Sequence, residues 1–165
     1  MKRYQTPSQT VGPFFAYVLT PEQYRYPFKQ LLPGRIDGKG KRITITGQVF
    51  DGKGVAITDA LVELWQEEGI ARQGTGTTPD ASFRFETVKP SRPYIDVIVF
   101  MRGLLSHLYT RLYFDDEAKV NQDDEVLASI AEERRDTLLA RHQGGGHYRF
   151  DIRMQGAHET VFFDL

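Results

Sequence analysis

One stretch of the 165-residue chain, "PSRPYIDVIVFMRG" at residues 90–103, carries polar side chains that could do chemistry. Successive residues of an extended strand point to opposite faces, so Tyr94, Asp96 and Arg102 share one face and the apolar residues between them share the other. Phenol and carboxylate oxygens can bind a hard metal ion, and a guanidinium can hold a carboxylate ligand. At ~3.3 Å per residue, Asp96 and Arg102 lie about 20 Å apart, so each needs its own partner.

Residue type alone leaves two roles open for Arg102. One role is that of an exposed arginine at a strand end, before the turn residue Gly103. The other is bidentate binding of a carboxylate ligand by the guanidinium, and the pattern favours the first. The acidic residues 115–117 directly follow another strand. A solvated turn is expected there, because one strand end supplies too few oxygens for a hard cation.

Other catalytic groups lack the spacing that their chemistry needs. Two histidines that bind one metal ion often lie two or four residues apart, and the four histidines of this sequence form no such pair. The serines have no G-x-S-x-G context, which disfavours a hydrolase. Because cysteine is absent, disulfides, thiolate metal sites and a cysteine nucleophile are excluded.

Alternating apolar and polar residues predict that β-strands position these side chains. Seven segments are rich in β-branched or aromatic residues and are separated by turn-forming residues. They are residues 42–50, 60–66, 82–88, 93–101, 107–114, 147–154 and 159–165. Six or seven short strands of this kind predict a mainly β protein with a β-sandwich fold.

Two segments have helical features. Residues 21–32 could form a short helix that Pro27 interrupts, and residues 123–146 carry apolar residues at helical spacing before three glycines. The second pattern predicts a short helical insertion between the late strands, and the glycines are expected to form a flexible loop rather than a phosphate cradle. We predict a single domain over residues 1–165 with an N-terminal arm over residues 1–41.

Charge and composition limit the classes of partner. The chain has 21 basic and 22 acidic residues, a net charge of −1, and thus no broad basic surface for nucleic acid or anionic lipid. No apolar run reaches the roughly 20 residues of a membrane span, and "MKRYQTPSQT" lacks the apolar stretch of a secretory signal. These features predict a cytoplasmic protein that binds neither nucleic acid nor membrane.

Five longer stretches resemble one family of enzymes. They are "TPSQTVGPFF" (6–15), "LVELWQ" (61–66), "FRFETVKP" (83–90), "RLYFDDEA" (111–118) and "YRFDIRMQGAHETVFFD" (148–164). Together they resemble the intradiol ring-cleaving dioxygenases, and among these the α subunits of heteromeric enzymes. The resemblance implies a β-sandwich core, in agreement with the strand pattern.

The resemblance also implies that the metal belongs to another chain. The family's catalytic β subunit holds a non-haem ferric ion with two tyrosines and two histidines, the histidines in an H-x-H on a strand. Tyr94 and Asp96 stand at those histidine positions here, the loop that would carry one tyrosine is missing before Pro93, and residues 67–76 contain no tyrosine. This chain is therefore expected to bind no metal, with Tyr94 and Asp96 as remnants that hydrogen-bond locally, since an unpaired buried polar group costs about 1–3 kcal/mol.

The same resemblance assigns no catalytic residue to this chain but implies contacts with the substrate in the β pocket. "QTVGP" (9–13) resembles the α-chain segment that lies over the substrate, and "FMRG" (100–103) matches a context in which an arginine reaches the shared site. Glycine permits close backbone approach and proline stiffens the chain. The implied substrate-binding residues are Thr10, Gly12, Pro13 and Arg102.

The resemblance thus implies a metal-free α chain that acts with a β chain carrying Fe(III). The αβ pair is expected to be the repeating unit of a higher oligomer. The complex is expected to use O₂ to cleave 3,4-dihydroxybenzoate between its hydroxyl-bearing carbons, giving 3-carboxy-cis,cis-muconate. At 165 residues the chain is expected to be shorter than family members, so contacts of the lost loops are open. The alternative is a stand-alone β-sandwich binding module without catalytic activity.

Overall fold

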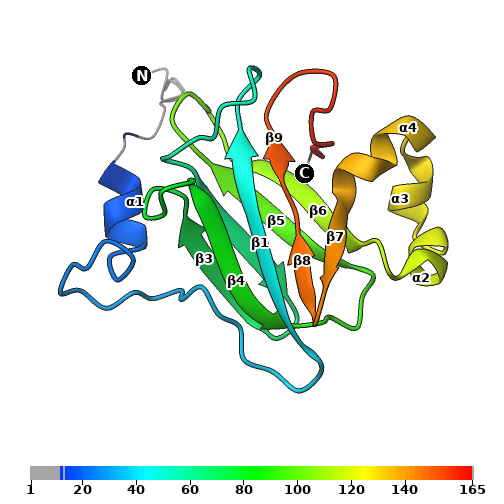
Figure 1. The fold of residues 1–165 in the computed structure, drawn as a ribbon, viewed down its shortest axis with the longest axis horizontal. Helices are drawn as coiled ribbons and strands as arrows, with labels where there is room; N and C mark the ends of the chain where they lie inside the picture. Colours follow the sequence, from blue (N-terminus) through cyan, green and yellow to red (C-terminus); the bar gives the residue numbers. More distant parts are fainter. Residues whose placement is uncertain (1–11, 13, 165) are drawn as a thin grey trace, which may run out of the picture.

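The computed structural model describes Gly12 and residues 14–164, and strands make up most of its regular structure (Figure 1). The strands are β1 (Arg42–Phe50), β2 (Leu61–Gln66), β3 (Gly69–Gly74), β4 (Ser82–Val88), β5 (Tyr94–Phe100), β6 (Leu108–Phe114), β7 (Leu139–Gly144), β8 (His147–Arg149) and β9 (Ile152–Arg153). The helices are α1 (Phe14–Leu19), α2 (Ala118–Gln122), α3 (Glu125–Ser129), α4 (Glu132–Arg135) and the 3₁₀-helix η1 (Asp136–Leu138).

The strands follow the order β3-β2-β5-β6-β7-β8-β1-β4, and β9 pairs with β1. Strand β7 pairs with β6 on one side and with β8 on the other, and so joins two groups of strands. The two groups lie in separate layers, with β1 and β8 in front of β5 and β6 in Figure 1. This arrangement confirms the predicted mainly β fold of the sandwich type, with short helices between β6 and β7.

The core lies between the two layers and uses alternate residues of each strand. In β1 the buried positions include Ile43 and Ile45, and in β5 they are Ile95, Val97 and Val99, all at most 3% exposed. Aliphatic side chains of this size stabilise the fold by about 1.5–3 kcal/mol each when fully buried. The predicted core face of β5 is therefore confirmed, and its opposite face carries Tyr94 and Asp96.

The segment before β1 runs along the open edges of the two layers. The amide of Arg72 in β3 donates to the carbonyl of Pro33 at 3.0 Å, and the amide of Glu86 in β4 donates to Gly34 at 3.1 Å. Ile36 returns a hydrogen bond to Glu86 and is buried. Unpaired edge strands are prone to association, so this segment protects both edges.

The helix predicted at residues 21–32 is wrong. The chain turns after α1, where the amide of Tyr26 donates to the carbonyl of Pro21, and Arg25 has a positive φ of 59° that ends regular helix. Pro27 then prevents a new helix, because its ring clashes with the preceding turn. The backbone that follows bonds to the sheet edges instead of to itself.

The predicted helical segment at residues 123–146 is right only in part. Its first half forms α3, α4 and η1, but Leu139 begins β7, since residues 139 and 140 pair in parallel with Tyr113 and Phe114 of β6. The strand predicted at residues 159–165 is reduced to a single bridge between Phe163 and Tyr109. Strand β3, with the polar sequence "GIARQG", was not among the predicted strands.

None of the helices in the described part of the chain combines the length and the apolar character that crossing a bilayer requires.

Candidate functional site

Tyr94 and Asp96, which stand where the family's catalytic chain has its histidine ligands, lie on the outer face of the layer formed by β2, β5 and β6. Tyr94 pairs with Tyr113 of β6, and Asp96 lies between Trp65 of β2 and Arg111 of β6. Because paired residues of neighbouring strands project to the same face, these side chains meet on the face opposite the main core, where Tyr113 is buried with Leu127 and Leu138. Strand register thus brings the phenol, the carboxylate and a guanidinium together.

Asp96 is held by one phenol and two arginines. The hydroxyl of Tyr109 donates to its Oδ1 at 2.5 Å, Nε of Arg111 lies 3.7 Å from the same oxygen, and Nη1 of Arg92 lies 3.7 Å from Oδ2. The Asp96 side chain is 21% exposed, so these partners replace much of its hydration. This is the local pairing that the sequence predicted for Asp96.

The ring of Tyr94 contacts cations and a second aromatic ring. The guanidinium carbon of Arg111 lies 3.9 Å from the Tyr94 centroid, that of Arg92 lies 5.2 Å away, and the Tyr113 ring centroid is at 5.5 Å. Guanidinium groups bind favourably over aromatic faces at such distances. Tyr94 therefore contributes its ring face to this site.

A second carboxylate joins the group from the helical insertion. The hydroxyl of Tyr113 donates to Oδ1 of Asp124 at 2.9 Å, and the same oxygen accepts the amide of Leu127, which caps α3. Nη1 of Arg111 lies 3.5 Å from the Tyr113 hydroxyl and 4.0 Å from Asp124. We call the six residues of this site the Arg111 cluster: Tyr94, Asp96, Tyr109, Arg111, Tyr113 and Asp124.

The phenols of the Arg111 cluster resist ionisation. Burial raises the pKa of Tyr113, and its hydrogen bond to Asp124 raises it further, although Arg111 partly opposes this. Burial likewise raises the pKa of Tyr109, with a contribution from the hydrogen bond to Asp96. A phenol binds ferric ion as its anion, so a raised pKa works against metal binding.

The Arg111 cluster does not fit the family's iron. A permanent cation already lies among its oxygens, and the phenols are held in their neutral form. No group of three or more His, Cys, Asp or Glu side chains that could hold a metal ion occurs within residues 14–164 and Gly12.

Arg102 lies apart from the Arg111 cluster, in the turn that follows β5. Its side chain is 61% exposed, and Nε forms an ion pair with Oδ2 of Asp59. Asp96 and Arg102 thus have separate partners, as their spacing along the strand predicted. The structure favours the exposed role for Arg102 and leaves its guanidinium accessible to a ligand.

The other predicted substrate-binding residues lie near the start of the chain. Gly12 is exposed, and an added Cβ there would meet no atom of the described residues within 4 Å. Thr10 and Pro13 lie outside the described residues. Their predicted role as pocket wall stays a prediction.

The acidic residues 115–117 form a turn that is tied to the core rather than a cation site. Lys89 donates to Asp116 at 3.0 Å and lies 2.8 Å from Glu117, while the Tyr148 hydroxyl donates to Asp116 at 2.9 Å. Asp115 accepts the amide of His142. The expected turn is confirmed, but its carboxylates Asp116 and Glu117 pair with the partly buried Lys89 and are not solvated alone.

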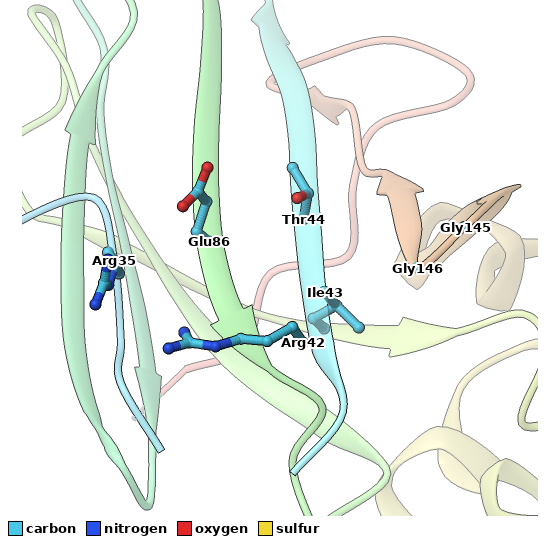
Figure 2. Close-up of a pocket in the computed structure, with 7 residues that line it drawn as sticks. All are labelled: Arg35, Arg42, Ile43, Thr44, Glu86, Gly145 and Gly146. Atoms are coloured by element: carbon cyan, nitrogen blue, oxygen red, sulfur yellow. The ribbon is translucent and has the colours of Figure 1, made fainter. Parts of the chain in front are cut away.

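Two open pockets on other faces are bordered by arginines that form ion pairs within the chain. One, of about 400 Å³, is bordered by Arg35, Arg42, Glu86 and the glycines of the β7–β8 turn, and Figure 2 shows Arg42 extending toward Arg35. Both arginines bind Asp37, at 2.8 and 2.7 Å, so their charge is already compensated.

The glycines beside this pocket have a structural role. Gly144, Gly145 and Gly146 all have positive φ, between 58° and 90°, which only glycine adopts without strain. The carbonyl of Gly146 accepts the amide of Thr44, so the turn is fixed to β1. The expected flexible loop is thus an ordered tight turn.

The second pocket, of about 540 Å³, lies beside β7 and β8. Its arginines Arg141 and Arg149 pair with Asp136 and Asp151. Arg153 also borders this pocket, and its guanidinium lies 5.0 Å from the centroid of the Phe50 ring.

Sequence reasoning missed four members of the Arg111 cluster. Tyr109, Arg111 and Tyr113 alternate in "HLYTRLYF", which places them on one face, so their grouping was available from period two. The pairing of that face with Tyr94 required the β5–β6 register. Asp124 carried no local signal, because the helical insertion brings it to the site.

Comparison with curated proteins shows what this fold and site belong to. The chain is 46% identical to the "Protocatechuate 3,4-dioxygenase alpha chain" of Burkholderia cepacia, over 98% of each chain, and 38% identical to that of Pseudomonas putida, over 98% of this chain and 96% of the relative. It is 28% identical to the beta chain of the Burkholderia cepacia enzyme, over 73% of this chain and 67% of the relative. No family model matches the chain.

Solved structures agree on the fold. The dioxygenase domain of a dioxygenase carbohydrate-binding fusion from Streptomyces sp. SirexAA-E superposes with a TM-score of 0.55 at 23% identity, over 81% of this chain and 93% of that one. An intradiol ring-cleavage dioxygenase from Tetranychus urticae gives a TM-score of 0.56 at 13% identity, over 82% and 92%. At these identities the likeness concerns the fold alone.

The alignment also confirms that this chain is short. It extends over 192 positions in the Burkholderia relative, whereas the chain has 165 residues, so at least 27 positions lack a residue here. These positions lie within the aligned region, so they correspond to internal segments that are shorter in this chain than in the relative. The extent and the identity of the match show that the chain belongs to the family of protocatechuate 3,4-dioxygenase alpha chains.

Proposed function

We propose that this chain is the metal-free half of a heteromeric ring-cleaving enzyme. Together with a beta chain that carries Fe(III), it converts 3,4-dihydroxybenzoate and O₂ into 3-carboxy-cis,cis-muconate. The observation that carries the proposal is the match to alpha chains over almost their whole length. The Arg111 cluster supports it, because a guanidinium stands among the oxygens at the remnant ligand positions.

The beta chain's iron would supply the redox chemistry, and this chain would supply part of the enclosure. In the proposal, the exposed guanidinium of Arg102 reaches the shared site and attracts the anionic substrate or product. Thr10, Gly12 and Pro13 line the pocket wall, where the small Gly12 allows close approach of the backbone. All four residues act by binding and positioning, and none takes part in bond making.

Exposed apolar side chains support a surface that a beta chain covers. Val18 and Phe28 are 73% and 66% exposed, and the ring of Tyr26 lies 6.2 Å from that of Tyr17 and 6.3 Å from that of Phe28, centroid to centroid. Leu105, which is 68% exposed, lies in the same loop as Arg102. Apolar groups gathered at a surface commonly mark a protein interface.

We further propose that the chain is one domain with an arm over residues 1–41, and that the complex works in the cytoplasm as a higher oligomer of alpha-beta units. The composition supports the cytoplasmic location, since the sequence offers no basic surface for nucleic acid and no membrane span.

Coexpression with a candidate beta chain tests the proposal. We expect the two chains to copurify, with iron and ring cleavage measured in the complex and neither measured in this chain alone. Stoichiometric iron in the purified single chain, together with O₂ consumption on catechols, would contradict it. A stable monomer that binds no beta chain would favour the alternative, a stand-alone binding module.

A further inference from the structure

The guanidinium of Arg111 lies among four oxygen atoms from three parts of the chain. Nε is 3.1 Å from the Tyr109 hydroxyl and 3.7 Å from Asp96, and Nη1 is 3.5 Å from the Tyr113 hydroxyl and 4.0 Å from Asp124. The Arg111 side chain is only 17% exposed. Such an arrangement surrounds a positive charge with oxygen donors, as a metal site does.

Two aromatic rings flank the guanidinium. The Tyr94 centroid lies 3.9 Å from its central carbon, and the Phe163 centroid lies 5.9 Å away. Rings on the guanidinium fix its plane while the oxygens bind its edge. Arg111 is therefore positioned by six residues of the surrounding structure.

The balance of charge at this site depends on Arg111. Asp96 and Asp124 are 21% and 12% exposed, and both lie within 4.0 Å of the guanidinium. Arg92 also lies near Asp96, at 3.7 Å, but it is 37% exposed and has no contact with Asp124 among the described residues. Without Arg111, Asp124 would keep only its hydroxyl and amide donors, and two partly buried carboxylates would face a common space.

We propose that Arg111 is the built-in cation of this site, and that its removal opens a site for a hard metal ion bound by Asp96, Asp124, Tyr109 and Tyr113. Hard cations prefer carboxylate and hydroxyl oxygens at about 2.3–2.6 Å, so these groups would close by about 1 Å around an ion in place of the guanidinium. The inference concerns this chain alone and does not depend on the proposed function.

Terbium(III) is a suitable probe, because it takes oxygen ligands and emits when a nearby tyrosine transfers energy to it. The full-length chain is titrated with Tb³⁺ as wild type, as Arg111→Ala and as the triple variant Arg111→Ala, Asp96→Asn, Asp124→Asn. We expect one sensitised Tb³⁺ per chain in Arg111→Ala. We expect at least tenfold weaker binding in both the wild type and the triple variant. Equal binding by all three proteins, or no binding by a folded Arg111→Ala, overturns the proposal.

Stability provides a second measurement, which decides the matter if Arg111→Ala folds poorly. Removing the guanidinium that both carboxylates share is expected to lower the melting temperature by about 5–10 °C. The triple variant should recover much of that loss, and Arg111→Lys, which keeps the charge, should lose less and bind no Tb³⁺. A triple variant no more stable than Arg111→Ala would overturn the role of Arg111 as counter-charge.

Discussion

The guanidinium carbon of Arg111 lies 3.9 Å from the centroid of the Tyr94 ring, on the strand next to it. This contact places a permanent cation beside one remnant ligand position, while the Asp96 carboxylate lies within 3.7 Å of the same side chain. A metal ion and a guanidinium cannot share this space, because both are cations that need the same oxygens. Arg111 thus balances the charge of the Asp96 and Asp124 carboxylates at this site.

Removing Arg72 is expected to destabilise the fold strongly. Its guanidinium binds Glu63 at 2.5 and 2.7 Å, and Glu63, which is 4% exposed, also accepts the Trp65 indole N–H at 2.8 Å. Arg72→Met leaves a buried carboxylate without its countercharge, which costs about 3–5 kcal/mol. Urea unfolding of the full-length chain measures this free energy.

The exposed pair Arg84–Glu86 is the matched control, since both side chains are more than half exposed. Arg84→Met should change the free energy of unfolding by less than about 1 kcal/mol. Equal effects of the two substitutions would contradict the difference in burial.

Tyr113 is expected to make the chain sensitive to alkaline pH. Burial raises its pKa above that of the unfolded chain, near 10, so the folded state holds the phenolic proton more tightly. The resulting stabilisation is complete below about pH 10 and is lost as pH rises through the folded-state pKa. Between pH 9.5 and 11.5 the melting temperature of the wild type should therefore fall more steeply than that of Tyr113→Phe.

At pH 7 the same variant should lose about 0.5–1.5 kcal/mol, because the hydrogen bond to Asp124 at 2.9 Å is gone. Tyr109 and Tyr148 also have raised pKa values, but they are present in both proteins and cancel in the comparison. Parallel curves for the two proteins would show that Tyr113 ionises alike in the folded and unfolded states.

Lys89 is expected to stabilise the turn after β6 in a pH-dependent way. Its ammonium group lies 3.0 Å from Asp116, 2.8 Å from Glu117 and 4.7 Å from the centroid of the Phe114 ring. Burial raises the pKa of Asp116, but hydrogen bonds from Lys89 and Tyr148 outweigh it, and the pKa lies below its ordinary value. This stabilisation is present above the unfolded pKa near 4 and is lost as pH falls through the folded value.

Lys89→Met should therefore cost about 1.5–3 kcal/mol at pH 7, and the difference from wild type should shrink below about pH 4. Lys53→Met, at an exposed loop position, is the control and should have little effect at either pH. Thermal melts at pH 7 and pH 3 give both comparisons. A Lys89→Met defect that stays constant with pH would rule out the ion pair as its cause.

The sequence was sufficient to predict the faces of the strands but not their partners. Period two placed Tyr94 and Asp96 outside the core, because every second residue of β5 must be apolar to fill the sandwich. The antiparallel register that sets Arg111 beside Asp96 depends on contacts distant in sequence. Leu139 is a second example. Its local sequence pattern is helical, but parallel pairing with Tyr113, which is distant in sequence, places it in a β-strand.

Gly12→Ala is expected to separate folding from function. An added Cβ at Gly12 meets no atom within 4 Å in the described part of the chain, so the melting temperature of the single chain should change by less than about 2 °C. If the segment lines the beta-chain pocket, the methyl group should raise KM for 3,4-dihydroxybenzoate in the complex. Steady-state kinetics of the copurified complex measure it, and an unchanged KM would remove Gly12 from the proposed wall.

Arg102→Ala in the alpha-beta complex tests the proposed contact between this chain and the substrate. The side chain is 61% exposed and pairs with Asp59, so its loss should leave the fold intact. A charged hydrogen bond to the substrate is worth about 1.5–3 kcal/mol, which corresponds to a loss of roughly 10- to 150-fold in kcat/KM. Arg84→Ala, another exposed arginine in an ion pair, should keep wild-type kinetics. Because both variants remove one surface charge, a general electrostatic effect would lower both alike, and an Arg102→Ala value within twofold of wild type would exclude Arg102 from the site.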